Sequence, residues 1–115
     1  MPYQGSCHCG AVKYSFDAPI ERVMECNCSI CARKGHLLAF GPLTAFTLHQ
    51  GKDALGDYQF GKKNIHHHFC KNCGIGVFGR AKQPDGNEGV AINARCIEGL
   101  DFKALPVDQF DGKSL

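Results

Sequence analysis

The sequence predicts a small, mainly β fold made of antiparallel sheets in a single domain. Three observations support this: short runs alternate apolar with polar side chains, turn residues separate those runs, and no amphipathic helix of useful length is present. A chain of 115 residues has the length of one domain and buries roughly two thirds of its unfolded surface. The hydrophobic core is therefore modest, and we expect a further source of stability.

The expected strands follow one another with turns between them. In the first strand, Val12, Tyr14 and Phe16 share one face, and the run ends at Asp17-Ala18-Pro19. The expected strands, in chain order, are 12–16, 37–40, 46–49, 57–60, 65–70, 77–78, 90–96 and 107–110. Residues 32–35 are expected to form at most one helical turn, because Gly35 would end it.

Seven of the eight cysteines fall in three clusters. These are Cys7-His8-Cys9, Cys26-Asn27-Cys28-Ser29-Ile30-Cys31 and Cys70-Lys71-Asn72-Cys73. Neighbouring cysteines rarely reach disulfide geometry but readily share a metal, and the N-terminal residues show no export signal. Thiolates are preferred ligands of Zn²⁺. The sequence therefore predicts zinc sites in a protein of the cytoplasm, where thiols stay reduced.

The spacing favours two zinc ions per chain, one in a closed site and one in an open site. We expect Cys7, Cys9, Cys70 and Cys73 to hold a structural zinc, and Cys26, Cys28 and Cys31 to hold a catalytic zinc. Four thiolates complete a tetrahedron, whereas three leave one position for a substrate. The alternative is a second structural zinc, in which Cys96 or a histidine completes the ligand set of the triplet.

Three thiolates weaken the Lewis acidity of zinc, because each donates electrons strongly. Such a zinc activates water poorly, but it lowers the pKa of an incoming thiol. We therefore expect thiol activation and not hydrolysis at Cys26, Cys28 and Cys31.

Several other polar residues are candidates for lesser roles. His36 follows the triplet and is placed to touch a bound thiol. The run His66-His67-His68 is expected on a solvated strand edge, with His68 able to donate a hydrogen bond to a zinc thiolate. Arg33, Lys34 and Arg80 are candidates for pairing with carboxylates of a peptide-like thiol, and Cys96 is expected to be a buried strand thiol.

The order of the cysteine motifs resembles the glutathione-dependent formaldehyde-activating enzyme (Gfa) family, which includes centromere protein V. The matching segments are Gly5-Ser6-Cys7-His8-Cys9-Gly10, Cys26-x-Cys28-x-x-Cys31 with Gly35 after it, Phe69-Cys70-x-x-Cys73-Gly74, and a strand that ends near Leu100-Asp101. The resemblance implies a β-tent-like domain over residues 1–115, stapled by two zinc ions on the same ligand sets. It also implies a reaction classed as that of a carbon-sulfur lyase, in which glutathione and formaldehyde form S-hydroxymethylglutathione.

Three functional classes remain open from the sequence. The first is an enzyme whose partners are a small thiol and formaldehyde or a related aldehyde, and the second is a zinc-stapled binding module with two structural zincs and no catalysis. The third binds aldehydes, metals or thiols without turnover. A formal net charge of +2 indicates no nucleic-acid partner, no apolar run predicts a membrane span, and no motif indicates an organic cofactor. The oligomeric state is not encoded in these patterns.

Overall fold

Strands provide most of the regular structure in the computed structural model, which describes residues 2–61 and 63–114. In chain order the strands and the helix are β1 (Tyr3–Ser6), β2 (Lys13–Phe16), β3 (Val23–Cys26), α1 (Ser29–Lys34), β4 (Leu38–Pro42), β5 (Phe46–Gln50), β6 (Leu55–Tyr58), β7 (Ile65–Cys70), β8 (Gly76–Lys82), β9 (Glu88–Asn93) and β10 (Val107–Phe110). Short 3₁₀ turns occupy Leu43–Ala45, Lys52–Ala54, Ala94–Cys96, Phe102–Ala104 and Gly112–Ser114.

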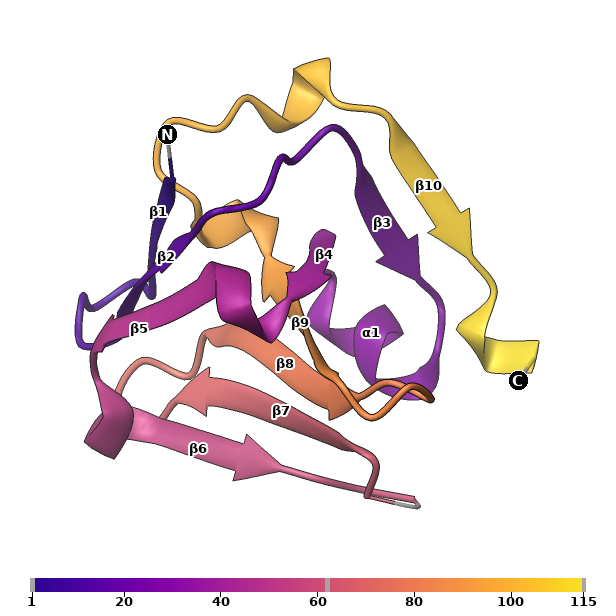
Figure 1. Ribbon diagram of the computed structural model, residues 1–115, viewed down its shortest axis with the longest axis horizontal. Helices are drawn as coiled ribbons and strands as arrows, with labels where there is room; N and C mark the ends of the chain where they lie inside the picture. The colour runs from indigo at the N-terminus through magenta and orange to yellow at the C-terminus, as the bar shows by residue number, and fades with distance from the viewer. Residues whose placement is uncertain (1, 62, 115) are drawn as a thin grey trace.

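The strands form two sheets. One has the order β1-β2-β5, and the other has the order β10-β3-β4-β9-β8-β7-β6. All pairs are antiparallel except β10 with β3, which run side by side in the same direction (Figure 1). The prediction of a mainly β fold is confirmed, and this parallel pair is its one departure from antiparallel pairing within the described residues.

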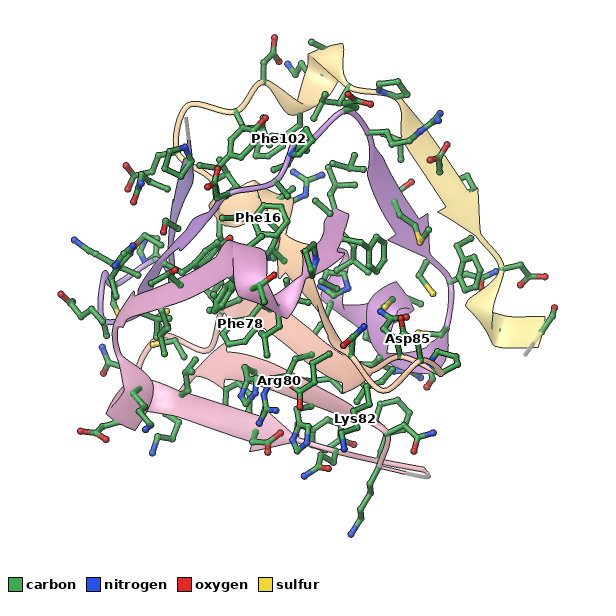
Figure 2. The ribbon with its side chains drawn as sticks, in the orientation of Figure 1. Phe16, Phe78, Arg80, Lys82, Asp85 and Phe102 are labelled. Carbon is green, nitrogen blue, oxygen red and sulfur yellow. The ribbon has the colours of Figure 1, made fainter. Side chains whose placement is uncertain are left out.

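Aromatic side chains join the two sheets. The ring of Phe46 in β5 lies 5.0 Å from that of Tyr14 in β2 and 4.4 Å from that of Phe78 in β8. Tyr14 and Phe16 are fully buried, as the alternation of their strand predicts. Figure 2 labels Phe16 and Phe78, whose rings lie in the interior between the sheets. The core is therefore a layer of side chains between the small sheet and the central strands of the large one.

Three local expectations need correction. The helix α1 begins at Ser29, inside the second cysteine cluster, although Gly35 ends it in the left-handed conformation as predicted. The expected strand at 90–96 is instead β9 (Glu88–Asn93), and Cys96 lies in the following 3₁₀ turn. The histidine run lies in β7, an inner strand between β6 and β8, so the expectation of a solvated edge is wrong.

Among the described residues, no helix has the length and apolar character needed to cross a membrane.

Candidate metal centres and the adjoining cavity

The four-cysteine cluster consists of Cys7, Cys9, Cys70 and Cys73, whose sulfur atoms all lie within 4.8 Å of one another. Two of them sit in the turn between β1 and β2, one ends β7, and one follows in the turn before β8. Gly10 and Gly74, which follow the two pairs, adopt positive φ angles of 82° and 81°. The cluster therefore lies where the small sheet meets the large one.

The sulfur spacing of this cluster fits a tetrahedral metal. The Cys7 and Cys9 sulfurs are 3.7 Å apart, and those of Cys9 and Cys70 are 3.6 Å apart. Four sulfurs held at about 2.3 Å from one zinc ion would be separated by about 3.8 Å. The donor set and its spacing thus fit zinc, with no ligand position left over.

Backbone amides favour the thiolate form in this cluster. The amides of Ile75 and Cys9 lower the pKa of Cys73 to about 6. The amide of Cys73 in turn lies 3.4 Å from the Cys70 sulfur, and that of Val12 lies 3.3 Å from the Cys7 sulfur. Because a metal binds the thiolate and not the thiol, these donors prepare the site for a cation.

The three-cysteine cluster consists of Cys26, Cys28 and Cys31, whose sulfurs also lie within 4.8 Å of one another. Cys26 ends β3, Cys28 precedes the first residue of α1, and Cys31 lies within that helix. The short helix brings Cys31 back towards Cys28, which a continued strand would not do. All three side chains are half-buried, whereas Cys7 and Cys70 of the other cluster are buried.

The thiols of the three-cysteine cluster differ in how readily they ionise: burial of Cys28 is outweighed by hydrogen bonds from the backbone and from neighbouring thiols, which lower its pKa, whereas the pKa of Cys31 is raised. Burial, together with the neighbouring Cys28 and Cys26, raises the pKa of Cys31 to about 12. A bound divalent cation would reverse this effect, because it favours deprotonation of every sulfur that contacts it. The cluster is therefore chemically suited to a metal ion.

The residues proposed to close this second site lie in different places. Nε2 of His36 is 3.3 Å from the Cys31 sulfur, and burial lowers the pKa of this imidazole to about 4. The Cys96 thiol points to the carbonyl oxygen of Gly76 at 3.9 Å, and its raised pKa, about 11, reflects burial and the charges of Cys7 and Cys73. Cys96 thus belongs to the surroundings of the four-cysteine cluster, and His36 to those of the triplet.

Residues 110–114, called here the C-terminal strap, cover the loop that carries the triplet. The amide of Asn27 donates to the carbonyl oxygen of Phe110 at 3.2 Å, and its side chain both donates to Asp111 and accepts from the amide of Lys113, each at 2.9 Å. Gly112 lies so close that an added Cβ would be 2.7 Å from the Cys26 sulfur. In Figure 1 this strap lies next to the loop between β3 and α1. The sequence contained no recognised signal for it.

A cavity of about 830 Å³ adjoins the three-cysteine cluster. The three cysteines, Lys34 and His36 line one part of it, and side chains of β4, β7, β8, β9 and the C-terminal strap line the rest. In Figure 2, sulfur atoms occur at two separate places, beside β2 and β5 and beside β3 and α1. Only the triplet among the two cysteine clusters contributes to the described lining of this cavity.

The basic residues expected to bind carboxylates have different environments. Lys34 lines the cavity, and its side chain covers Gly76, where an added Cβ would be 3.1 Å from Nζ. Arg80 also lines the cavity and is labelled in Figure 2. Arg33 is instead directed to its own helix, donating to the carbonyl oxygen of Ser29 at 2.8 Å.

Two histidines of β7 are engaged in ways that the sequence did not indicate. The ring of His67 lines the cavity, although it was expected on a solvated edge. His68 is buried, with Nδ1 3.1 Å from the carbonyl oxygen of Gly56 and Nε2 accepting from Nε of Arg80 at 3.2 Å. Both ring nitrogens of His68 are occupied, so the expected hydrogen bond to a zinc thiolate is not formed.

The chain was compared with protein families and solved structures. Residues 2–107 match the family described as glutathione-dependent formaldehyde-activating enzyme. A crystal structure of a Rhodobacter sphaeroides protein is 29% identical, with a TM-score of 0.78 over 90% of this chain and 98% of that chain. The family match spans all seven clustered cysteines and β1 to β9. The chain therefore belongs to the glutathione-dependent formaldehyde-activating enzyme family.

Proposed function

We propose that this protein is a zinc-dependent enzyme of the carbon-sulfur lyase type. It activates a small thiol, glutathione, at the three-cysteine cluster for addition to formaldehyde or a related aldehyde. The proposal takes residues 1–115 as one zinc-binding domain, with a structural zinc on the four-cysteine cluster and a catalytic zinc on the triplet. Its location would be the cytoplasm, where cysteines that form no disulfide stay reduced and available to a metal.

One observation carries the proposal: the three-cysteine cluster borders a large cavity. Three thiolates leave one tetrahedral position free, and the cavity of about 830 Å³ gives a reactant access to that position. A purely structural zinc has no need of such access. The family match supports glutathione and formaldehyde as the reactants.

Zinc bound at the triplet would supply a soft cation that favours deprotonation of an incoming thiol. In the net reaction a carbon–sulfur bond forms, the carbonyl π bond breaks, and the thiol proton ends on the former carbonyl oxygen. No oxidant or reductant is required. The reverse reaction releases the aldehyde and the thiol.

The residues of the chain would position the reactants. His36, uncharged at neutral pH because burial lowers its pKa to about 4, would hold the Cys31 sulfur through Nε2. Lys34 brings a positive charge to the same side of the cavity and is suited to a carboxylate of glutathione or to the developing alkoxide. Partial burial lowers the pKa of Lys34, which eases proton transfer to that oxygen.

A second candidate function rests on the contact between His36 and Cys31. If the imidazole rotated to complete a four-ligand zinc site, the protein would be a binding module with two structural zincs. The distance of 3.3 Å from Nε2 to the Cys31 sulfur makes His36 the residue to test. The two functions differ in whether an added thiol reaches the metal.

The experiment must separate catalysis from the spontaneous reaction of glutathione with formaldehyde. We would use NMR at equilibrium to measure how fast ¹³C-formaldehyde exchanges between its free form and its adduct with glutathione. The measurement would be made with and without the zinc-loaded protein. The proposal predicts faster exchange that is first order in protein. An exchange rate equal to the background, or one burst per protein molecule, would contradict it and favour a binding or sequestering role.

Two cysteine variants provide the matched comparison. Cys28→Ser removes a ligand of the proposed catalytic zinc, whereas Cys96→Ser removes a thiol outside both clusters. Native mass spectrometry of each protein with glutathione would count zinc ions and bound thiol. We expect two zincs and a glutathione adduct for the wild type and for Cys96→Ser. Loss of the adduct in Cys28→Ser supports the open site, whereas its absence from the wild type supports the binding module.

A further inference from the structure

The cavity has room for a carbonyl reactant larger than formaldehyde. Its volume is about 830 Å³. Pockets that hold one drug-sized molecule span roughly 300 to 1,000 Å³, and this cavity lies toward the upper part of that range. Formaldehyde has two heavy atoms and needs only about twice the ~30 Å³ of a water molecule. The volume therefore does not restrict the carbonyl reactant to formaldehyde.

The cavity is bordered by exposed apolar side chains. Phe40 is 54% exposed, Phe60 41%, Ile65 46% and Phe110 42%, and all four line the cavity. They come from β4, the segment between β6 and β7, β7 itself and the end of β10. Exposed apolar side chains that line one cavity are typical of a surface on which an apolar ligand is buried.

Part of this apolar wall is already held in place by stacking. The Phe60 ring is 5.5 Å from that of His67 at an interplanar angle of 18°, and 5.8 Å from that of Tyr58 at 28°. A ring fixed between two neighbours loses little conformational freedom when a ligand packs against it. Phe60 is thus a fixed part of the wall against which a ligand can pack.

The charged side chains of the cavity bear on where glutathione sits. Lys34 lines the cavity together with the triplet. Arg80 is occupied by Nε2 of His68 and by a carboxylate oxygen of Glu88, at 3.2 and 3.6 Å. Asp85 and Glu88 also line the cavity, and their carboxylates disfavour those of glutathione beside them. Lys34 is then the cation available to a carboxylate of glutathione, and the exposed apolar side chains are left to the carbonyl reactant.

We propose that the carbonyl reactant of this site is an aldehyde with an extended apolar or aromatic substituent, which packs against Phe40, Phe60 and Ile65. This inference rests on the proposed function and names the substrate class for it. The reaction is the same addition. The thiol sulfur bonds to the aldehyde carbon, the carbonyl π bond breaks, and the thiol proton passes to oxygen, giving a hemithioacetal that retains the substituent. No further reactant is needed.

The first test compares a series of aldehydes on the zinc-loaded protein with glutathione. Exchange rates by NMR, corrected for the spontaneous reaction, would be measured for formaldehyde, propanal and hexanal. We expect kcat/KM, divided by the rate constant for the spontaneous addition of the same aldehyde, to rise about fourfold for each added methylene that is buried. Equal or falling values along the series would overturn the inference while leaving the proposed function intact. No protein-dependent exchange with any aldehyde would overturn both.

A pair of variants tests the apolar wall. Phe40→Ser should lower the ratio of the hexanal to the formaldehyde kcat/KM by about tenfold, because the side chain that contacts the substituent is lost. Val107→Ser is the control: Val107 is also an exposed apolar residue of a strand, at 41%, and it is outside the residues that line the cavity. A ratio that stays unchanged in Phe40→Ser, or that falls equally in both variants, would overturn the assignment of the wall.

A binding measurement without turnover provides an independent readout. The Ile65 methyl resonances of the protein would be followed by NMR during titration with 1-hexanol, which has no carbonyl group. A saturable shift at Ile65 that Phe40→Ser weakens supports the inference. No shift, or a concentration-dependent dimer that Phe40→Ser dissociates, would overturn it, because the wall would then bind no chain of this kind or would be covered by a second copy of the protein.

Discussion

The two cysteine clusters use the same donor atom for different structural purposes. The four-cysteine cluster draws its ligands from turns far apart in the sequence and joins the two sheets, with Cys7 and Cys70 only 4% and 0% exposed. The three-cysteine cluster takes all its ligands from one loop and helix turn, is half-buried, and borders the cavity. Two clusters of the same donor atom thus occupy different positions in one fold, one where two sheets meet and the other beside a cavity.

The largest effect should come from breaking the closed cluster. Cys70→Ser removes a buried ligand that links β7 to the first turn, so the proposed metal would no longer hold the two sheets together. We expect the melting temperature of the zinc-loaded protein to fall by more than about 10 °C. Circular dichroism melts and zinc content would check this, with Cys96→Ser as control. A melt close to that of the wild type would show that this cluster is not the structural one.

Breaking the open cluster should affect activity and leave the fold largely intact. In Cys28→Ser we expect thiol-dependent exchange to fall by about a hundredfold, since one ligand of the proposed catalytic metal is lost. The melting temperature should change by only a few degrees, roughly one kcal/mol of stability. If Cys28→Ser unfolds as readily as Cys70→Ser, the contrast between the clusters is wrong and both are structural.

Chelation should remove the two metals at different rates. The triplet borders a cavity and leaves one ligand position open to a chelator, whereas a metal on four thiolates offers no open position, even though Cys9 is exposed. We expect release of zinc to a chromophoric chelator in two phases that differ at least about tenfold in rate. The faster phase should vanish in Cys28→Ser. A single phase accompanied by unfolding would contradict the proposed difference.

The C-terminal strap allows the open cluster to be disturbed without touching a ligand. In Gly112→Ala the new methyl group would lie 2.7 Å from the Cys26 sulfur, so either the strap or the sulfur must move. We expect exchange activity to fall by about tenfold, while the slow phase of zinc release is unchanged. Ser114→Ala, which removes an exposed hydrogen bond to Asp111, is the matched control in the same segment. Equal activities in the two variants would show that the strap does not influence the site.

The smallest expected effect concerns the sheet that carries Cys7 and Cys9. Burial raises the pKa of Tyr14, so the folded state holds its phenolic proton at a pH where the unfolded state releases it. Stability from this difference is fully present below about pH 10 and is lost as the pH rises above that value. We would measure the free energy of unfolding in urea at pH 8 and at pH 11. Between these two pH values it should fall by about 1 kcal/mol more in the wild type than in Tyr14→Phe. Parallel losses in both proteins would contradict this.

The sequence predicts the grouping of the cysteines better than it predicts their surroundings. Seven cysteines in three clusters allow few complete ligand sets, and the structure brings together the two sets expected. Val12, Tyr14 and Phe16 are likewise buried, because alternation directly encodes the face of a strand. That a metal occupies either set remains a prediction, which the zinc measurements above address.

The sequence predictions missed or misassigned the features that depend on strand order. Alternation places His67 and His68 on opposite faces of β7, but it does not reveal that β6 and β8 flank that strand, so the edge assignment failed. The strap depends on the parallel pairing of Phe110 with Cys26, a contact between distant segments that no local pattern records. The helix α1 has only six residues, too few for a periodic signal.

The C-terminal strap has a consequence for how the protein is made. The triplet, within residues 26–31, leaves the ribosome long before Phe110 and Gly112, which form part of the cavity beside it. During synthesis the three thiols are therefore collected in one loop while that wall is still absent. A metal ion that bound at this stage would reach them before the strap forms, and the strap would later cover one side of the loop while the cavity side stays open. The order of synthesis thus favours loading first and covering by the strap afterwards.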